Sequence, residues 1–276
     1  MSINNCTKNS DNFQAWVYLF DFPIRQFSFG LRILQIKGYN TRSMKIDILT
    51  LFPKMFTGPF DESIVKRAQD KGKVEINIHD LRSFGEGERK TVDDRPYGGG
   101  VGMLLKVDII DKSLSSLFAG HKSPNTKIVL LDATGNKFTQ GKAQQLAKLK
   151  HLILIAGHYE GVDHRVHEHL ADEVISIGDY VLTGGELPAM VVTDTVVRLL
   201  PGVLEKPEAT TSESFSPVTN HQLPITTLEF PQFTRPEEYK GWKVPDVLLS
   251  GNHKEIAKWR EKEALKKTKK VRPDLF

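Results

Sequence analysis

Three short segments combine glycines with charged or aromatic side chains in patterns that suit ligand binding. The first runs from Thr91 to Met103 and has four glycines within five positions, preceded by Asp93, Asp94 and Arg95. Glycines adopt backbone dihedrals closed to other residues and let a ligand approach the main chain closely. No Gly-Lys-Ser/Thr follows, so this is not a Walker phosphate loop. A plain glycine-rich turn explains the segment equally well.

The second segment, Gly157-His158-Tyr159-Glu160-Gly161-Val162-Asp163, directly follows a predicted strand. Glycine at a strand end lets a ligand meet the backbone, and Glu160 can receive a cationic group. Histidines in and after this segment raise the question of a metal site. Their spacing is not His-Glu-x-x-His, and a solvated helix face explains it better. We therefore expect no metal site.

The third segment extends from Ile177 to Met190 and contains two adjacent glycines. A strand ends there, a short extended stretch follows, and a helix begins with Pro188 in its first turn. Backbone donors and acceptors beside apolar side chains suit a purine ring and its ribose. Without further information, a plain loop explains these residues nearly as well.

Two charged residues downstream, Arg198 and Glu213, are uninformative by themselves. An arginine at a helix end usually forms a surface ion pair. A glutamate in a polar linker is usually solvated. Neither residue alone indicates catalysis.

Alternating secondary structure must position these segments. We predict strands over 45–51, 73–79, 127–132, 151–155 and 172–176, of which 73–79 alternates cleanly between apolar and polar residues. The helices expected between and after them span 61–71, 106–118, 139–149, 161–170 and 186–199. Such alternation is typical of an α/β fold with a mostly parallel sheet. Insertions at 80–105 and 177–186 are rich in glycine and charge, as are many loops that carry sites in α/β proteins.

The chain divides into four regions. Residues 1–43 have no sustained period, and we expect an extension that is not part of the fold. Residues 44–204 form the alternating α/β domain, and 205–221 are a flexible, polar linker. Residues 222–276 are a small helical domain whose helix, over 254–270, is rich in lysine and arginine.

Composition restricts the class of protein without identifying it. The 276 residues carry a net charge of +4, which permits a nucleic-acid partner but does not require one. One cysteine, Cys6, cannot form an internal disulfide and indicates a reducing compartment. No apolar stretch is long enough to cross a bilayer, and the start is a poor signal peptide. We expect a soluble, cytoplasmic protein with no membrane partner.

Taken together, the motifs resemble the bacterial tRNA (guanine-N1-)-methyltransferase family, a group of knotted SPOUT methyltransferases. The match runs in order from Met44 to Phe276, and its most specific part is Ser-Ile-Gly-Asp-Tyr-Val-Leu-Thr-Gly-Gly-Glu-Leu-Pro-Ala-Met, residues 176–190. Other matching segments are Leu51-Phe52-Pro53, Thr91 to Gly100, Gly157 to Asp163, Arg198 to Leu204, Phe233-Thr234-Arg235-Pro236, and Val247 to His253.

The resemblance implies a SPOUT-type, mostly parallel sheet with a deep trefoil knot, plus the small C-terminal α-helical domain. It also implies a homodimer with active sites between subunits. The methyl donor would be S-adenosylmethionine, and the product N1-methylguanosine just 3′ of the anticodon in tRNA. A Mg²⁺ ion in the reaction, without a dedicated protein site, is left open.

By position, the family pattern also assigns site residues. Arg198 matches the catalytic arginine, and Glu213 falls where the family has an aspartate, the proposed general base. We expect tRNA to contact Asp93, Asp94 and Arg95, and to meet Lys266 and Lys267 through its phosphates. The residues expected to line the donor pocket are Gly157, Tyr159, Glu160, Ile177, Gly178, Asp179, Tyr180, Val181, Leu182, Gly184, Gly185 and Pro188.

Two segments depart from the family pattern, and two rival functions remain open. Val101 replaces a usual proline, and Leu131-Asp132-Ala133-Thr134-Gly135 replaces the common Leu-Ser-Pro-Gln-Gly. One rival is another SPOUT enzyme, such as a ribose 2′-O-methyltransferase, which needs no carboxylate to deprotonate a guanine. The other is a non-catalytic RNA-binding protein, which has no reason to keep a donor pocket.

Overall fold

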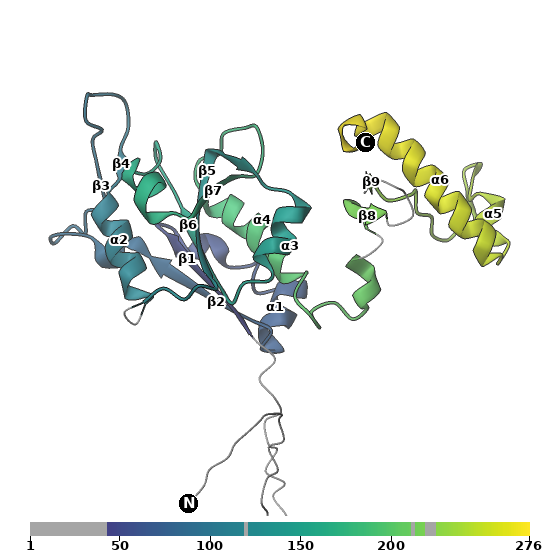
Figure 1. Ribbon diagram of the computed structural model, residues 1–276, viewed down its shortest axis with the longest axis horizontal. Helices are drawn as coiled ribbons and strands as arrows, with labels where there is room; N and C mark the ends of the chain where they lie inside the picture. Colours follow the sequence, from purple (N-terminus) through teal and green to yellow (C-terminus); the bar gives the residue numbers. More distant parts are fainter. Residues whose placement is uncertain (1–42, 119–120, 211–212, 219–224) are drawn as a thin grey trace, which may run out of the picture. The chain divides into compact units, whose positions relative to one another are not determined.

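A five-stranded parallel sheet forms the centre of the computed structural model, which describes residues 43–118, 121–210, 213–218 and 225–276 (Figure 1). In spatial order the strands are β2 (Val74–Asp80), β1 (Met44–Thr50), β6 (His151–Ala156), β5 (Thr126–Lys137) and β7 (Glu173–Ser176). All four neighbouring pairs are parallel. The predicted α/β class with a mostly parallel sheet is confirmed.

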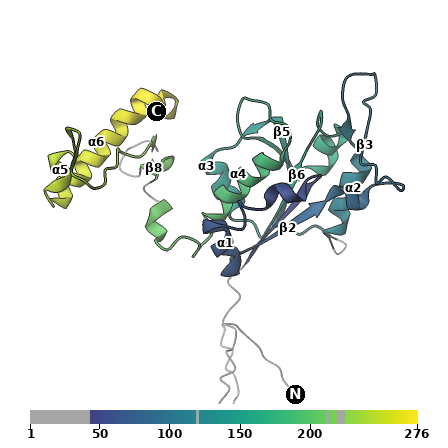
Figure 2. The same ribbon diagram turned by 180° about the vertical axis from the view of Figure 1, so that it is seen from behind.

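Helices cover both faces of this sheet (Figures 1 and 2). Helices α1 (Ser63–Asp70), α3 (Gln140–Leu146) and α4 (Glu186–Val197) pack on one face, and α2 (Val107–Ser116) packs on the other. Accordingly Ile46 and Ile48 of β1 belong to one core, and Leu49 to the other. Burial of both faces explains why the inner strands β1 and β6 read as nearly continuous apolar runs, whereas the edge strand β2 alternates apolar and polar residues.

A carboxylate is buried within this layer. Asp47 of β1 is fully buried and accepts hydrogen bonds from His79 (2.8 Å), His151 (2.5 Å) and Asn77 (3.1 Å), with Lys45 at 2.9 Å. Burial alone would raise the pKa of Asp47, but these hydrogen bonds together hold it well below its usual range. The charged form of Asp47 therefore contributes to the stability of the fold.

The predicted helix over 161–170 is wrong in its first half. Only Val166–Leu170 is helical, as a single π-type turn. Gly161 has a φ of 119°, and Val162 forms a parallel bridge with Leu105, so this part of the chain is extended. Strand β5 also continues beyond its predicted end, because its pairing with β7 resumes at Asn136 after a register shift.

The insertion at 80–105 forms a short 3₁₀ turn, Leu81–Phe84, and then a two-stranded antiparallel ladder. Its strands are β3 (Asp93–Asp94) and β4 (Leu104–Leu105). The amide of Leu105 donates to the carbonyl of Gly161, and the amide of Asp163 donates to that of Leu105. These bonds fix the first glycine-rich motif beside the second.

Among the described residues, the last part of the chain contains two short strand pairs, two α-helices and a final 3₁₀ turn, Pro273–Leu275. β8 (Ser216–Val218) pairs with β9 (Ile225–Thr227), and β10 (Glu238–Tyr239) pairs with β11 (Trp242–Lys243). Helix α5 (Asp246–Leu249) precedes α6 (His253–Val271), which confirms the predicted basic helix. The side chain of Asn252 caps α6 by accepting from the amide of Glu255 (3.3 Å).

The predicted domain boundaries and the knot stay predictions. The extension 1–43 lies outside the described residues except for Ser43, as do parts of the linker 205–221. None of the described helices is long and apolar enough to span a membrane.

Candidate active site

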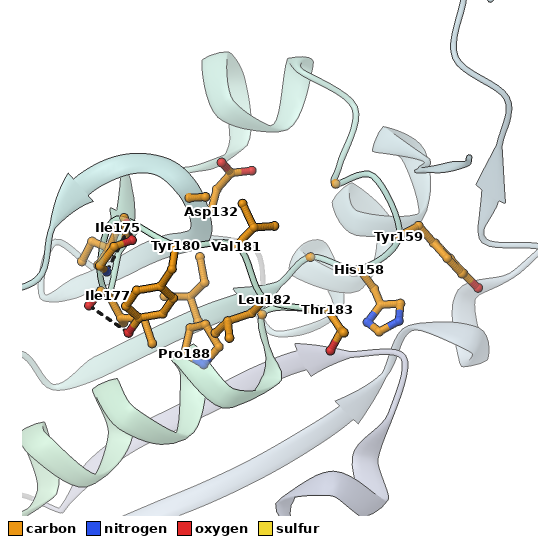
Figure 3. A pocket seen from close by; sticks show the side chains of 18 of the residues that line it. Asp132, His158, Tyr159, Ile175, Ile177, Tyr180, Val181, Leu182, Thr183 and Pro188 are labelled. Carbon is orange, nitrogen blue, oxygen red and sulfur yellow. Dashed lines mark hydrogen bonds between the residues drawn. The ribbon is translucent and has the colours of Figure 1, made fainter. Parts of the chain in front are cut away.

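A pocket lies at the carboxyl ends of β6 and β7 and beside residues 131–133, where the regular pairing of β5 is interrupted (Figure 3). Three segments form its wall: residues 131–133 in β5, residues 157–161 after β6, and most residues between 175 and 188, which run from the end of β7 into α4. The carboxyl ends of parallel strands are the usual place for ligands in open α/β sheets. The second and third glycine-containing motifs therefore meet here.

Of the twelve residues expected to bind the donor, eleven line this pocket: Gly157, Tyr159, Glu160, Ile177, Gly178, Tyr180, Val181, Leu182, Gly184, Gly185 and Pro188. Asp179 does not line it. The Asp179 side chain is 90% exposed and pairs with Lys137 at 3.2 Å. The Asp179 side chain is therefore not part of the pocket wall.

Sequence reasoning missed eight further lining residues: Leu131, Asp132, Ala133, His158, Gly161, Ile175, Ser176 and Thr183. Five of them lie in strands β5 and β7; the sequence predicted both strands, but ended β5 at residue 132. The signal was available, because parallel strands present their carboxyl ends at one edge of the sheet. The sequence motifs indicated the glycine-containing loops and not these strand residues.

Gly185 lets the loop after β7 close against the end of β6. A Cβ atom added at Gly185 would lie 2.7 Å from the Cα of Ala156, which is a backbone clash. The amide of Gly185 donates to the carbonyl of Gly157 (2.7 Å), and Gly184 bridges to His158. Only a residue without a side chain permits this approach.

The buried carboxylate of Glu186 supports the contact between the loops that follow β6 and β7. Glu186 is 1% exposed and accepts a hydrogen bond from the hydroxyl of Thr50 (2.8 Å). Its second oxygen lies 3.4 Å from Nδ1 of His158, and the His158 ring packs on Phe52 with 4.6 Å between centroids. The loop after β6 is therefore held to the core through His158.

Tyr159 and Glu160 occupy the outer part of the pocket wall. Tyr159 is 42% exposed and has a φ of 61°, a left-handed conformation that is uncommon for an aromatic residue. Backbone strain of this kind is concentrated at ligand sites. The Glu160 side chain packs over Gly102, where an added Cβ would lie 2.3 Å from it, and its amide donates to Met103.

Asp132 is a pocket carboxylate with fixed partners. It accepts from the amide (2.8 Å) and the hydroxyl (2.7 Å) of Thr134, and His167 lies 3.5 Å away. Burial alone would raise the pKa of Asp132, but the bonds from Thr134 and the nearby His167 lower it. Asp132 and Glu160 therefore give the pocket acidic character.

The residues expected to contact tRNA lie in two places. Asp93 and Asp94 form β3, beside the loop that packs on Glu160, and the amide of Arg95 donates to the Asp94 carboxylate (2.7 Å). Lys266 and Lys267 are exposed on α6.

In the described part of the chain, no group of three or more His, Cys, Asp or Glu side chains is placed to hold a metal ion.

Arg198 and Glu213 form a bidentate ion pair. Nη1 of Arg198 donates to Oε1 of Glu213 (2.8 Å), and Nη2 donates to Oε2 (2.5 Å). The hydrogen bond to Glu213 raises the pKa of Arg198 above its usual value. The side chains are only 30% and 17% exposed, so Glu213 is not the freely solvated residue that a polar linker suggests. Neither residue lines the pocket.

The sequence profile of the family described as "tRNA (Guanine-1)-methyltransferase TrmD" matches residues 44–276. The chain belongs to this methyltransferase family. It is 55% identical over 233 residues to the tRNA (guanine-N(1)-)-methyltransferase of Geobacillus kaustophilus, covering 84% of this chain and 91% of that protein. The enzyme of the same name from Dictyoglomus turgidum is also 55% identical (84% and 90% covered), and that of Moorella thermoacetica is 47% identical with the same coverage.

Membership of the methyltransferase family confirms the resemblance inferred from the motifs. The profile covers the whole α/β layer together with the basic C-terminal helix. Both the pocket and the Arg198–Glu213 pair therefore lie within the region that defines the family.

Proposed function

We propose that this methyltransferase transfers a methyl group from S-adenosylmethionine to N1 of the guanine just 3′ of the anticodon in tRNA. The observation that carries the proposal is the glycine-walled pocket at the ends of β6 and β7, in a chain that belongs to the tRNA (guanine-1)-methyltransferase family. The Arg198–Glu213 pair adds the acid–base chemistry that methylation of N1 needs.

The chemistry of the pocket suits S-adenosylmethionine. Ile177, Leu182 and Pro188 gather on one side and offer apolar surface to a purine (Figure 3). Backbone groups around the glycines can pair with its polar edge, and the carboxylates of Asp132 and Glu160 suit the ribose hydroxyls and the cationic amino group. When bound, the donor supplies an electrophilic methyl group on a sulfonium.

The acceptor must be made nucleophilic by this chain. N1 of guanine carries a proton at neutral pH, so a carboxylate must remove it, and we assign this role to Glu213. Charge then develops toward O6, where the guanidinium of Arg198 can donate hydrogen bonds. N1 and O6 are neighbours on one edge of the base, as Glu213 and Arg198 are neighbours here. Guanine would insert its edge between them, which requires their ion pair to open.

Helix α4 separates the pocket from this pair within one chain. Pro188 lines the pocket and Arg198 caps the other end of the helix, so ten residues at 1.5 Å each place them ~15 Å apart along the axis. Methyl transfer needs the reacting atoms about 3–3.5 Å apart. We therefore propose a homodimer in which the pair of one copy serves the pocket of the other.

An apolar stripe on α4 provides the surface for the second copy. Leu187 and Val191 are 48% and 45% exposed and lie one turn apart on the helix face that leads to Arg198. Val181, which is 86% exposed beside the pocket, extends the same kind of surface. Exposed apolar residues gathered in this way mark association surfaces.

Product analysis tests the proposed reaction against its rivals. The protein is incubated with tRNA and methyl-labelled S-adenosylmethionine, and the RNA is digested to nucleosides. We expect labelled 1-methylguanosine. A labelled 2′-O-methylnucleoside would instead support the ribose methyltransferase. Binding of tRNA without binding of S-adenosylmethionine in calorimetry would support a non-catalytic RNA-binding protein.

Mixed dimers test the shared site. Arg198→Ala removes a member of the pair, and Glu160→Arg places a cation in the pocket, and each variant should be inactive alone. Refolded together in equal amounts, half of the dimers are mixed and each has one intact site, so activity should return to roughly a quarter of wild type. Two differently tagged Arg198→Ala chains are the control. No recovery in the mixture would contradict a site shared between copies.

A further inference from the structure

The net positive charge of the chain is concentrated at its C-terminal end. Residues 235–276 contain 12 Lys and Arg and 7 Asp and Glu, a net charge of +5, whereas the whole chain has 38 and 34, a net charge of +4. The first 234 residues therefore carry a net charge of −1. This segregation favours a polyanion as the partner of the C-terminal segment.

Two exposed aromatic rings lie within this basic segment. Tyr239 and Trp242 are cross-strand partners in the β10–β11 ladder, so their side chains share one face, with 5.9 Å between ring centroids. They are 55% and 72% exposed. We call residues 238–243 the aromatic hairpin. Two large aromatic rings gathered on one exposed face are a candidate interaction surface.

Cations surround the aromatic hairpin. Lys240 lies over the Tyr239 ring, with Nζ 5.3 Å from its centroid, and Lys243 is 72% exposed. Glu238, 3.6 Å from Lys243, offsets part of this charge. Aromatic rings interleaved with lysines at an exposed turn match the way that single-stranded nucleic acid is bound, through base stacking and phosphate contacts.

A pocket adjoins the base of the hairpin. Glu237 and Val244, which flank the hairpin and are joined by a 2.9 Å backbone hydrogen bond, both line it. Phe233, Arg235 and Arg260 line it too, and Phe233 is 49% exposed. The surface thus continues from the exposed rings to a recess with two guanidinium groups, which can receive a phosphate.

We propose that the aromatic hairpin is a stacking platform for an unpaired nucleotide of the tRNA substrate. The base lies on Trp242, and Lys240 and Arg235 contact the adjoining phosphates. The proposal rests on the proposed function, because it names a second contact with the same RNA. It differs from the phosphate contacts expected of α6, since stacking adds affinity that does not depend on salt.

Variants of Trp242 separate stacking from charge. Trp242→Ala should weaken tRNA binding roughly 10-fold, while the slope of log K against log salt stays as in wild type. Trp242→Phe should retain most of the affinity. Lys240→Ala should make the salt slope shallower by about one. Phe276→Ala is the matched control, because Phe276 is 51% exposed in the same segment with Lys269 over its ring, and should bind as wild type.

Kinetics and sedimentation complete the test. At saturating tRNA, Trp242→Ala should methylate in a single turnover at the wild-type rate, so that the loss is confined to KM. Wild-type affinity and KM in Trp242→Ala, in a wild-type enzyme that does methylate tRNA, would overturn the stacking platform alone. A wild-type enzyme that transfers no methyl group to tRNA would overturn the proposed function. Loss of the dimer in Trp242→Ala would show that a second copy covers the ring, and would also overturn the proposal.

Discussion

Replacing Glu213 with glutamine keeps the size and shape of the side chain but removes its negative charge. The amide cannot accept the N1 proton of guanine. It also has only one acceptor oxygen, so it cannot keep both hydrogen bonds from Arg198 (2.8 and 2.5 Å). Loss of a positioned general base costs about 10²–10⁴ in rate. We therefore expect the single-turnover rate of Glu213→Gln to fall roughly 10²-fold or more, which corresponds to about 2.7 kcal/mol of barrier.

The same substitution should also lower stability modestly. The pair is neither fully buried nor fully exposed, with Arg198 30% and Glu213 17% accessible. Its loss should cost about 1–2 kcal/mol, between the values for surface and buried pairs. Thermal unfolding measures this, and the variant should remain folded at the temperature of the assay.

The assay is single-turnover methylation of tRNA by wild type, Glu213→Gln and Glu213→Asp across a range of pH. Glu213→Asp keeps the carboxylate and should retain substantial activity. Binding of S-adenosylmethionine, measured by calorimetry, should be unchanged in both variants, because Glu213 does not line the donor pocket. If Glu213→Gln methylates at nearly the wild-type rate at every pH, the general base is another residue.

Three further predictions concern the pocket, the buried carboxylate and the length of the chain. Gly185→Ala should weaken donor binding more than tenfold with little effect on tRNA affinity, because the new Cβ clashes with the backbone at Ala156; unchanged donor affinity in calorimetry would refute this. Asp47→Asn should lower the melting temperature at pH 7, and the difference from wild type should shrink below pH ~4. The reason is that the pKa of Asp47 is lower in the folded than in the unfolded chain, so its stabilising effect is present above the unfolded pKa and is lost as pH falls. A melting-temperature difference that does not vary with pH would contradict the role of this charge. A chain shortened to Met44–Phe276 keeps every residue matched by the family profile and should methylate tRNA at the wild-type rate, and a large loss would show that residues 1–43 take part.

Two patterns placed the strands of the sheet. The residues of β1, β2, β6 and β7 were placed to within about two residues. The inner strands β1 and β6 are mostly buried and leave a nearly continuous apolar pattern, whereas the edge strand β2 alternates apolar and polar residues. The helix predicted over 161–170 is wrong in its first half, because Val162 forms a bridge with Leu105 that competes with local helix propensity. A contact between residues so distant in sequence leaves no trace in local periodicity.

The candidate site was predicted in part for a similar reason. Glycine motifs identified the pocket wall after β6 and β7, but they gave no indication of Asp132 or of the support that Glu186 gives to His158. The Arg198–Glu213 pair depends on how the linker folds back on α4, which spacing alone does not reveal.

Reverse transcription of the methylated tRNA tests the central claim most directly. A methyl group on N1 blocks the Watson–Crick edge of guanine, so the reverse transcriptase should stop one nucleotide short of the modified base. We predict a single stop at the guanine 3′ of the anticodon, dependent on S-adenosylmethionine, and no stop when that guanine is replaced by adenine. A stop at another guanine, or methyl transfer that produces no stop, would contradict methylation of N1 at this position.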